Sequence, residues 1–424
     1  MRPVNIVSGE GFKSLIQCLE PAYSLPRRET VMHAVKSKYT TTKQTLQTKI
    51  ENCKALSLTT DIWTSNQMES YMTVTAHFIS NNWLLHSFVL ETKELGVSHT
   101  AANIGERLSE VMADFRIPAE KRVAIVHDNA ANIVLCAEQL SRNPSWGKVQ
   151  GVRCTGHTLQ LCINVALKKD PVCRVVAAAR RLVGHFKKSA KATVALADKQ
   201  KQQNVVEHKL IQDVSTRWNS TQCMLERLLE QRWPVTAVLS DPNTTQRSDR
   251  DLDLTAVQWR IAEDIVSVLK PMVTLTELLS QDDNVSLSAT LPMLINMKRR
   301  HLLLREDDGA AATAMKNTLR EEIDKRWELN GELQTSIYIK AAVLDPRFKS
   351  LSFMEEEKRD EAYTTVFELA ESLTPAEEPA QRPLDEDDNE PMPLQKKRKQ
   401  DEISMLMGTD EEQQAEEQNS EMER

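Results

Sequence analysis

The sequence predicts a mixed α/β sheet followed by a long all-helical domain and a disordered acidic tail. Runs rich in β-branched and aromatic residues fall in the first part of the 424-residue chain and alternate there with helical patterns. From residue 219 to about 374, nearly every segment has the apolar spacing of a helix. Beyond residue 375 the chain is rich in Pro, Glu, Asp and Gln with almost no aromatic residues, which predicts disorder.

The first strands follow a helical segment. Residues 1–50 have helical spacing, and the next apolar run, which ends at Asp61, predicts a first strand over 55–61. The stretches "YMTVTAHFI" (71–79) and "WLLHSFVLE" (83–91) flank the turn signal "SNN", so they predict a hairpin joined to that strand. The spacing then predicts a helix over 100–115, with Thr100 as its N-cap.

Alternating strands and helices complete the predicted sheet. The continuous apolar run "RVAIVHD" (122–128) suits a central strand covered on both faces. A helix at 129–140, a strand near 150–154 and a helix from about 157 follow. Five long helical patterns then extend to residue 373. The predicted organisation is a helical N-terminal segment at 1–50, a sheet domain at 51–218, a helical domain at 219–374 and a tail at 375–424.

Charge and cysteine content narrow the class of protein. Residues 375–424 contain 16 acidic and 6 basic residues, a net of −10, so the rest of the chain carries about +3 from 48 bases and 45 acids. Such a near-neutral body neither requires nor excludes a nucleic-acid partner. Seven cysteines without a Cys-x-x-Cys pair, no apolar N-terminal signal and no run of eighteen apolar residues predict an intracellular, soluble protein without a membrane partner.

Two carboxylates stand at the ends of predicted strands. Asp61 and Asp128 would emerge on one edge of the sheet if their strands are neighbours. Converging carboxylates repel unless a divalent cation joins them, and their oxygens favour Mg²⁺ or Mn²⁺. Such ions can activate water and stabilise a leaving oxygen in phosphodiester cleavage. The alternative is that both aspartates serve the turns in which strands commonly end.

Five stretches in their order and spacing carry a family resemblance over residues 3–375. They are "LTTDIWTS", "HDNAANIV", "CTGHTLQLCINVAL", "DVSTRWNSTQCMLERLL" and "AAVLDPRFK". Together they resemble the transposases of the hAT superfamily and the zinc-finger BED proteins domesticated from them. The resemblance implies an RNase H-like catalytic fold interrupted by a long helical insertion.

The resemblance also implies roles for particular residues. Asp61 and Asp128 match the first two acids of the family's Asp-Asp-Glu metal triad. Cys154 and His157 match its Cys-x-x-His motif near the active site. Arg217 and Trp218 match the Arg-Trp pair that helps to hold a flipped base beside a DNA hairpin, and stacking of Trp on an unpaired base would stabilise binding by about 1–3 kcal/mol.

Structural alternatives stand beside these roles. Cys154 and His157 have the spacing of half a zinc site, but no second pair lies close in sequence, so no zinc is predicted. Trp218 could instead pack the helical domain against the sheet. Asp213 is predicted to be an N-cap or an ion-pair partner of Arg217. The stretch 345–348, "DPRF", predicts a turn that ends a helix and buries its Phe.

Three parts of the family pattern have no match in this sequence: the BED finger, the C-terminal dimerisation region and the stretch that holds the third acid. Without that Glu, two-metal hydrolysis is expected to fail, and Mg²⁺ or Mn²⁺ is not expected to be retained. The basic cluster Lys396, Lys397, Arg398 and Lys399 favours a nuclear import receptor as partner over a chance basic interruption.

The sequence therefore predicts a nuclear, transposase-derived regulator that associates with DNA or chromatin and has no strand-transfer activity. Its helical domain would contact other proteins. Two alternatives stay open: a fragment of an active transposase or nuclease, and a pure protein-interaction scaffold. Salt-dependent retention on DNA distinguishes the scaffold, since phosphate-driven binding weakens as salt rises.

Overall fold

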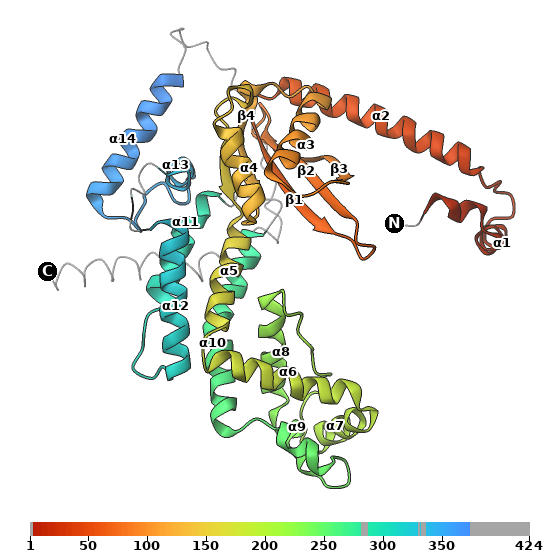
Figure 1. Cartoon of the computed structure of the whole chain (residues 1–424), viewed down its shortest axis with the longest axis vertical. Helices are drawn as coiled ribbons and strands as arrows, with labels where there is room; N and C mark the ends of the chain where they lie inside the picture. Colours follow the sequence, from red (N-terminus) through yellow and green to blue (C-terminus); the bar gives the residue numbers. More distant parts are fainter. Residues whose placement is uncertain (1–2, 281–286, 330, 332–335, 374–424) are drawn as a thin grey trace, which may run out of the picture. The chain divides into compact units, whose positions relative to one another are not determined.

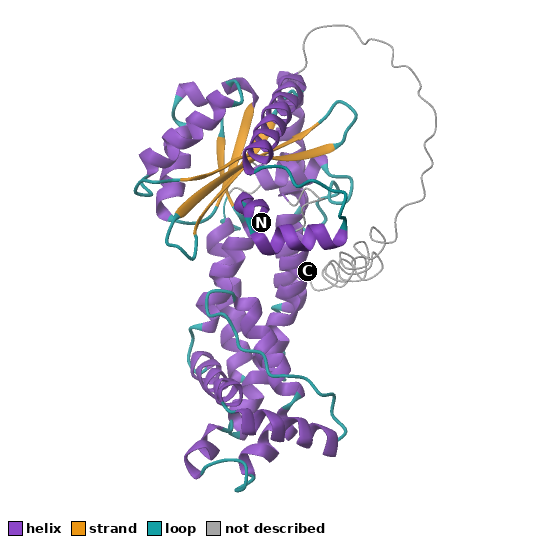
Figure 2. Cartoon of the chain, turned by 90° about the vertical axis from the view of Figure 1, so that its right-hand side faces the viewer, coloured by secondary structure: helices purple, strands orange, loops and turns teal. Residues whose placement is uncertain are grey.

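The chain folds as two compact units, which are described separately. The computed structural model describes residues 3–280, 287–329, 331 and 336–373. We call Met1–Cys154 the sheet unit and Thr155–Arg424 the helical unit. Figure 1 follows the chain through both, and Figure 2 shows the strands, all of which, within the described residues, belong to the sheet unit. The predicted acidic tail and its basic cluster lie outside the described residues.

The sheet unit contains the predicted elements in the predicted order. Its main helices are α1 (Glu10–Leu19), α2 (Arg28–Asn52), α3 (Ala101–Asp114) and α4 (Ala131–Ser141). Its strands are β1 (Leu56–Thr64), β2 (Ser70–Ile79), β3 (Leu85–Glu94), β4 (Arg122–His127) and β5 (Gln150–Arg153). Short 3₁₀ turns lie at Val4–Ser8, Ala119–Lys121 and Pro144–Trp146. Thr100 caps α3 by accepting a hydrogen bond from the backbone N–H of Asn103, as predicted.

The five strands form one mixed sheet in the order β3-β2-β1-β4-β5. Strands β1, β2 and β3 pair antiparallel, as expected for a meander with short connections. Strand β4 pairs parallel with β1, and β5 pairs parallel with β4. Each parallel strand is reached through a helical crossover, so the carboxyl ends of β1, β4 and β5 lie at one edge of the sheet.

Alternation along β1 separates two faces of the sheet. Leu56, Leu58 and Thr60 are buried, and the two leucines pack in a core that includes Ile104 of α3 and Ile133 of α4. Residues at the odd-numbered positions, among them Asp61, point to the other face. There Thr59 hydrogen-bonds His77 at 3.2 Å, Thr73 hydrogen-bonds Thr92 at 2.8 Å, and Trp63 stacks on Tyr71. One face is therefore a hydrophobic core and the other is polar.

The prediction that β1 ends at Asp61 is wrong. The strand continues to Thr64, and its last four residues pair with β2 from Asp61↔Thr73 to Thr64↔Ser70. Asp has a low strand propensity, which made it look like a terminator, but the long β2 partner overrides that preference. Asp61 is therefore an exposed residue inside a strand rather than a turn residue.

The helical unit contains ten helices among the residues that the structure describes. They are α5 (Thr155–Leu167), α6 (Val172–Lys188), α7 (Ala190–Gln202), α8 (Trp218–Glu230), α9 (Arg232–Ser240), α10 (Ala256–Leu279), α11 (Leu287–Asn296), α12 (Ala310–Trp327), α13 (Ile337–Leu344) and α14 (Glu356–Leu373). A 3₁₀ turn lies at Arg247–Leu252 and a π-helical turn at Met297–His301. None of the described helices is both long and apolar enough to cross a membrane.

The boundary between the units lies earlier than predicted. The sequence places it at 218/219, whereas the chain divides between Cys154 and Thr155. Helices α5, α6 and α7 bury residues such as Leu159, Leu182 and Leu196 in the same hydrophobic core as Leu225 of α8 and Leu269 of α10. These three helices therefore belong to the helical unit, because a shared core is what makes a set of elements one compact unit.

Candidate functional site

The sheet register brings three of the predicted site residues to one edge of the sheet. Thr59 of β1 pairs with Val126 of β4, and Asp61 and Asp128 each come two residues further on, Asp61 within β1 and Asp128 just after β4. His127 pairs with Arg153 of β5, which sets Cys154 level with Asp128. Neighbouring strands lie about 4.8 Å apart. Asp61 thus lies within β1, and Asp128 and Cys154 directly follow the carboxyl ends of the neighbouring parallel strands β4 and β5.

Local hydrogen bonds hold Asp128 at the end of β4. Its Oδ1 accepts a hydrogen bond from the backbone N–H of Ala130 at 2.9 Å, which forms the turn into α4. Burial lowers the pKa of His127, so its imidazole is neutral at pH 7, and Nδ1 lies 2.6 Å from the Asp128 carbonyl oxygen. The backbone N–H of Cys154 donates to the His127 carbonyl at 2.7 Å. One carboxylate oxygen of Asp128 therefore has a structural role.

A cavity of about 200 Å³ lies beside Asp128. Its walls include Thr60 and Trp63 of β1, His99 before α3 and Asn132 of α4, whereas Asp61 does not line it. The Thr60 hydroxyl is buried and has no hydrogen-bond partner among the residues that the structure describes. A buried polar group without a partner costs about 1–3 kcal/mol, so water or a polar ligand group in the cavity would stabilise this hydroxyl.

Asp61 and Asp128 suit a divalent cation as a pair of ligands. Their oxygens are the type that Mg²⁺ and Mn²⁺ prefer, and Mg²⁺ in proteins commonly takes one or two carboxylates together with substrate phosphates. Among the described residues, no group of three or more His, Cys, Asp or Glu side chains could hold a metal ion. The assignment of Asp61 and Asp128 to a metal triad stays a prediction.

The predicted residues His157, Arg217 and Trp218 lie in the helical unit. His157 is exposed in the first turn of α5, and Cys154, three residues earlier, is the last residue of the sheet unit. Arg217 is exposed and precedes α8, whereas Trp218, the first residue of α8, is only 2% exposed. A base could stack on Trp218 only if the indole left the core. The nucleic-acid role of these residues stays a prediction.

The prediction that Asp213 is an N-cap or an ion-pair partner of Arg217 is wrong, since Arg217 itself is the N-cap residue of α8 and Asp213 pairs with Arg180. Its carboxylate, whose side chain is 2% exposed, lies 2.7 Å from the guanidinium of Arg180 and accepts a hydrogen bond from Thr221 at 2.8 Å. Burial acts to raise the pKa of Asp213, but the hydrogen bonds from Arg180 and Thr221 and the charge of Arg180 outweigh it, so that pKa lies below its usual value. Asp213 joins α6 to α8 and is a structural residue.

The "DPRF" stretch is the turn that the sequence predicts. Helix α13 ends at Leu344, Asp345 accepts a hydrogen bond from the backbone N–H of Arg347 at 3.0 Å, and Phe348 is buried. Ser288 also donates to Asp345, at 2.7 Å. These contacts join the turn to α11 and indicate a packing role.

Sequence reasoning missed the polar walls of the cavity and the partner of Asp213. Thr60 adjoins Asp61, and Asn132 lies four residues after Asp128, so both fall inside stretches already singled out. Neither residue type indicates a cavity by itself. Arg180 lies 33 residues before Asp213, and only the packing of α6 against α8 brings them together.

Comparison with known proteins agrees with this architecture. Residues 59–149 match the model of the ZBED1 RNase-like domain, and residues 152–268 match that of the ZBED1 RNase-like helical domain. The two matches meet where the structure divides, and they confirm the predicted RNase-like fold with a helical domain.

Curated relatives include regulators and transposases. The human zinc finger BED domain-containing protein 4 is 26% identical over 382 residues, which cover 87% of this chain and 31% of that protein. A putative AC transposase of Zea mays is 27% identical, with 82% of this chain and 43% of that protein covered. The putative transcriptional regulator tpeD of Talaromyces stipitatus is 26% identical, with 67% and 37% covered.

The chain thus spans less than half the length of these relatives. Its helical unit begins at Thr155, close to residue 152, where the match to the family's helical domain begins. The chain is a hAT transposase-derived protein of the zinc-finger BED type.

Proposed function

We propose that this chain is a nuclear regulator that associates with DNA and neither cuts nor joins it. A transposase-related regulatory role follows from the relatives named above. The single observation that carries the finer proposal is the pair Asp61, within β1, and Asp128, directly after the neighbouring parallel strand β4, with one Asp128 oxygen accepting a backbone hydrogen bond. Two acids can help to seat a cation against a DNA phosphate, but two-metal cleavage needs more ligands to position the water.

Asp61 and Asp128 are the residues that would hold Mg²⁺ or Mn²⁺. Such an ion, when bound, supplies a positive charge for phosphate oxygens. A carboxylate has about four lone-pair sites, so Asp61, which is exposed, and Asp128, whose Oδ1 accepts one hydrogen bond in the turn, both have acceptor capacity for this role. No zinc role is proposed for Cys154 and His157.

Metal binding by this pair is tested by calorimetry with Mn²⁺ on the full chain. We expect Mn²⁺ binding that is too weak for the ion to be retained on purification, because only two acids supply it, and that weakens at least fivefold further in Asp61→Asn and in Asp128→Asn. Asn at 128 keeps an acceptor for the Ala130 N–H, so the turn survives while the charge is lost. The control is Glu138→Gln, which changes an exposed carboxylate of α4. Equal Mn²⁺ affinity in all four proteins would show that the aspartates serve only the strands and the turn.

DNA association is tested by retention of the full chain on hairpin and duplex DNA as KCl rises from 50 to 200 mM. Retention is expected to fall steeply, because phosphate contacts release counterions. Arg217 is exposed beside α8, so Arg217→Ala should weaken binding and reduce the salt slope by about one. The matched control is Arg142→Ala, an exposed arginine of the sheet unit. Retention that does not change with the KCl concentration would favour the alternative that the chain is a pure protein-interaction scaffold.

Nuclear localisation is proposed from the basic cluster at residues 396–399, which an import receptor would bind. A reporter fused to residues 375–424 is expected to enter the nucleus, and one that stayed in the cytoplasm would contradict the proposal.

The second candidate is a DNA-cleaving enzyme of which this chain is a part. Two observations favour it. The first is the same pair of aspartates, and the second is that this chain matches 43% of the length of the Zea mays relative, which is named a putative transposase. Metal-dependent nicking of DNA would distinguish it from the regulator.

A further inference from the structure

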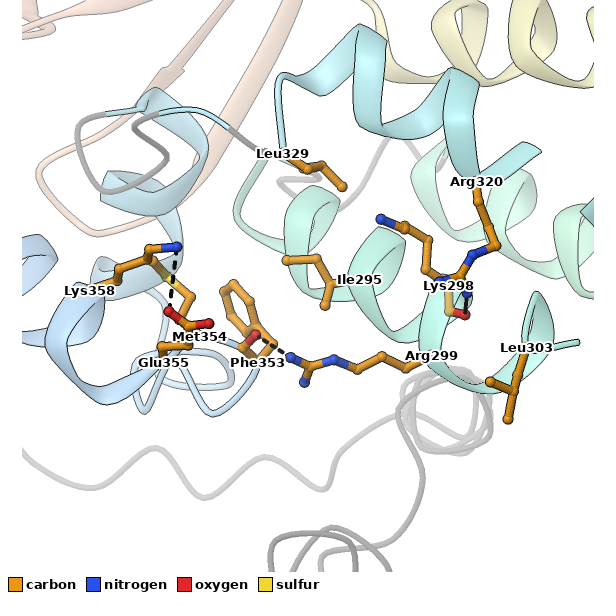
Figure 3. A pocket seen from close by; sticks show the side chains of 10 residues that line it. All are labelled: Ile295, Lys298, Arg299, Leu303, Arg320, Leu329, Phe353, Met354, Glu355 and Lys358. Carbon is orange, nitrogen blue, oxygen red and sulfur yellow. Dashed lines mark hydrogen bonds and ion pairs between the residues drawn. The ribbon is translucent and has the colours of Figure 1, made fainter. Parts of the chain in front are cut away.

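A basic pocket in the helical unit has no role in the function proposed above. It has a volume of about 420 Å³ and is formed by residues of α11, the π-helical turn Met297–His301, α12 and the start of α14 (Figure 3). Four bases line it, namely Lys298, Arg299, Arg320 and Lys358, against one acid, Glu355. We call the cavity that is lined by these five residues and by Ile295, Leu303, Leu329, Phe353 and Met354 the basic pocket. π-Helical turns are rare and often mark functional sites.

Two of the four bases have no carboxylate partner among the described residues. Lys298 forms an ion pair with Asp324, and Lys358 lies 3.5 Å from Glu355. In contrast, Arg299 donates to the carbonyl oxygen of Phe353 at 3.1 Å, and Arg320 donates to that of Lys298 at 2.9 Å. A carbonyl does not neutralise a guanidinium, and each Arg carries five N–H donors. The pocket therefore has charge and hydrogen-bonding capacity for an anion.

The pocket also has an apolar floor. Ile295, Leu329, Phe353 and Met354 contribute it, and Figure 3 shows Arg299 extending across the pocket toward Phe353. A DNA phosphodiester would use the arginines but leave this floor uncovered. An acidic peptide with apolar side chains would use both, since carboxylates pair with guanidinium groups and apolar side chains gain from burial.

We propose that the occupant is the chain's own acidic segment, residues 383–394. The stretch "PLDEDDNEPMPL" has five acidic residues flanked by Leu384, Met392 and Leu394. Helix α14 rises 1.5 Å per residue, so Leu373 lies about 22 Å along the helix from Lys358. The 11 residues 374–384 span up to about 36 Å when extended, which is enough to return to the pocket.

The test is fluorescence anisotropy with a labelled peptide of residues 383–394 and the full chain. In the wild type the tethered segment, at an effective concentration on the order of millimolar, should exclude the peptide. A tail-neutral chain, in which Asp385, Glu386, Asp387, Asp388 and Glu390 become Asn or Gln, should bind it at least tenfold more tightly. Adding Arg299→Ala and Arg320→Ala should abolish that gain, and adding Arg142→Ala instead should leave it unchanged. The tail-neutral change leaves the pocket intact.

Two results would overturn the proposal. One is equal peptide affinity in the wild-type and tail-neutral chains. The other is no peptide binding in any chain while the double arginine variant, with an unchanged melting temperature, loses retention on duplex DNA. In that case the basic pocket is a nucleic-acid site.

Discussion

Replacement of Trp218 by alanine is expected to lower the free energy of unfolding of the helical unit by about 3–5 kcal/mol. Trp218 is 2% exposed and is among the largest fully buried side chains of the chain. Its removal loses apolar burial and leaves a cavity at the start of α8. Urea denaturation of the full chain measures the change.

Trp233 provides a matched control for Trp218. It lies on α9 of the same unit and is 66% exposed, so Trp233→Ala should cost less than about 1 kcal/mol. If Trp218→Ala kept the stability of the wild type but lost retention on hairpin DNA, the packing role would be wrong and the base-stacking role right.

The Asp213→Asn substitution is expected to lower the free energy of unfolding by about 2 kcal/mol at pH 7. The amide cannot supply the negative charge that faces Arg180, and hydrogen bonds to charged groups contribute about 1.5–3 kcal/mol. Because the Arg180 side chain is 37% exposed, water compensates part of the loss. The control is Glu207→Gln, which alters an ion pair with Lys201 that is more than half exposed and should cost less than about 0.5 kcal/mol.

The cost of Asp213→Asn should depend on pH in one direction. The pKa of Asp213 is lower in the folded chain than in the unfolded chain, so its stabilisation is complete above the unfolded pKa of about 3.9. It is lost as the pH falls from there through the folded pKa. Urea denaturation should give a difference in free energy of unfolding between the wild type and Asp213→Asn that is constant from pH 7 to about pH 4.5. Below that pH, and down to pH 3.5, the difference should shrink. A difference that shrinks above pH 6 would point to another titrating group.

Much of the sheet unit could be predicted from sequence because its signals are local. Strands such as 71–79 carry β-branched residues, and Thr100 precedes a helical pattern as an N-cap does. The end of β1 could not be predicted, since it depends on pairing with β2 rather than on the propensity of Asp61. The unit boundary was misplaced for a similar reason: whether α6 and α7 belong to one core or another is decided by packing far along the chain.

The candidate site, too, has features that the sequence could predict and features that it could not. Asp61 and Asp128 could be singled out as residues, but only the parallel pairing of β1 with β4 brings them to one edge of the sheet. The burial of Trp218 and the Arg180–Asp213 pair depend on contacts between helices that no spacing rule reveals. The two guanidinium groups of the basic pocket are brought together by the turn after α11 and by α12, which are separate in sequence.

The most direct test of the central claim, DNA association without cleavage, is a nicking assay. The full chain is incubated with supercoiled plasmid and with hairpin DNA in Mg²⁺ and in Mn²⁺, beside Asp61→Asn as the matched control. We expect that nicked or joined products do not exceed those of Asp61→Asn, although the same chain is retained on the same DNA at low salt. Metal-dependent nicking that Asp61→Asn abolishes would contradict it and establish the chain as an enzyme.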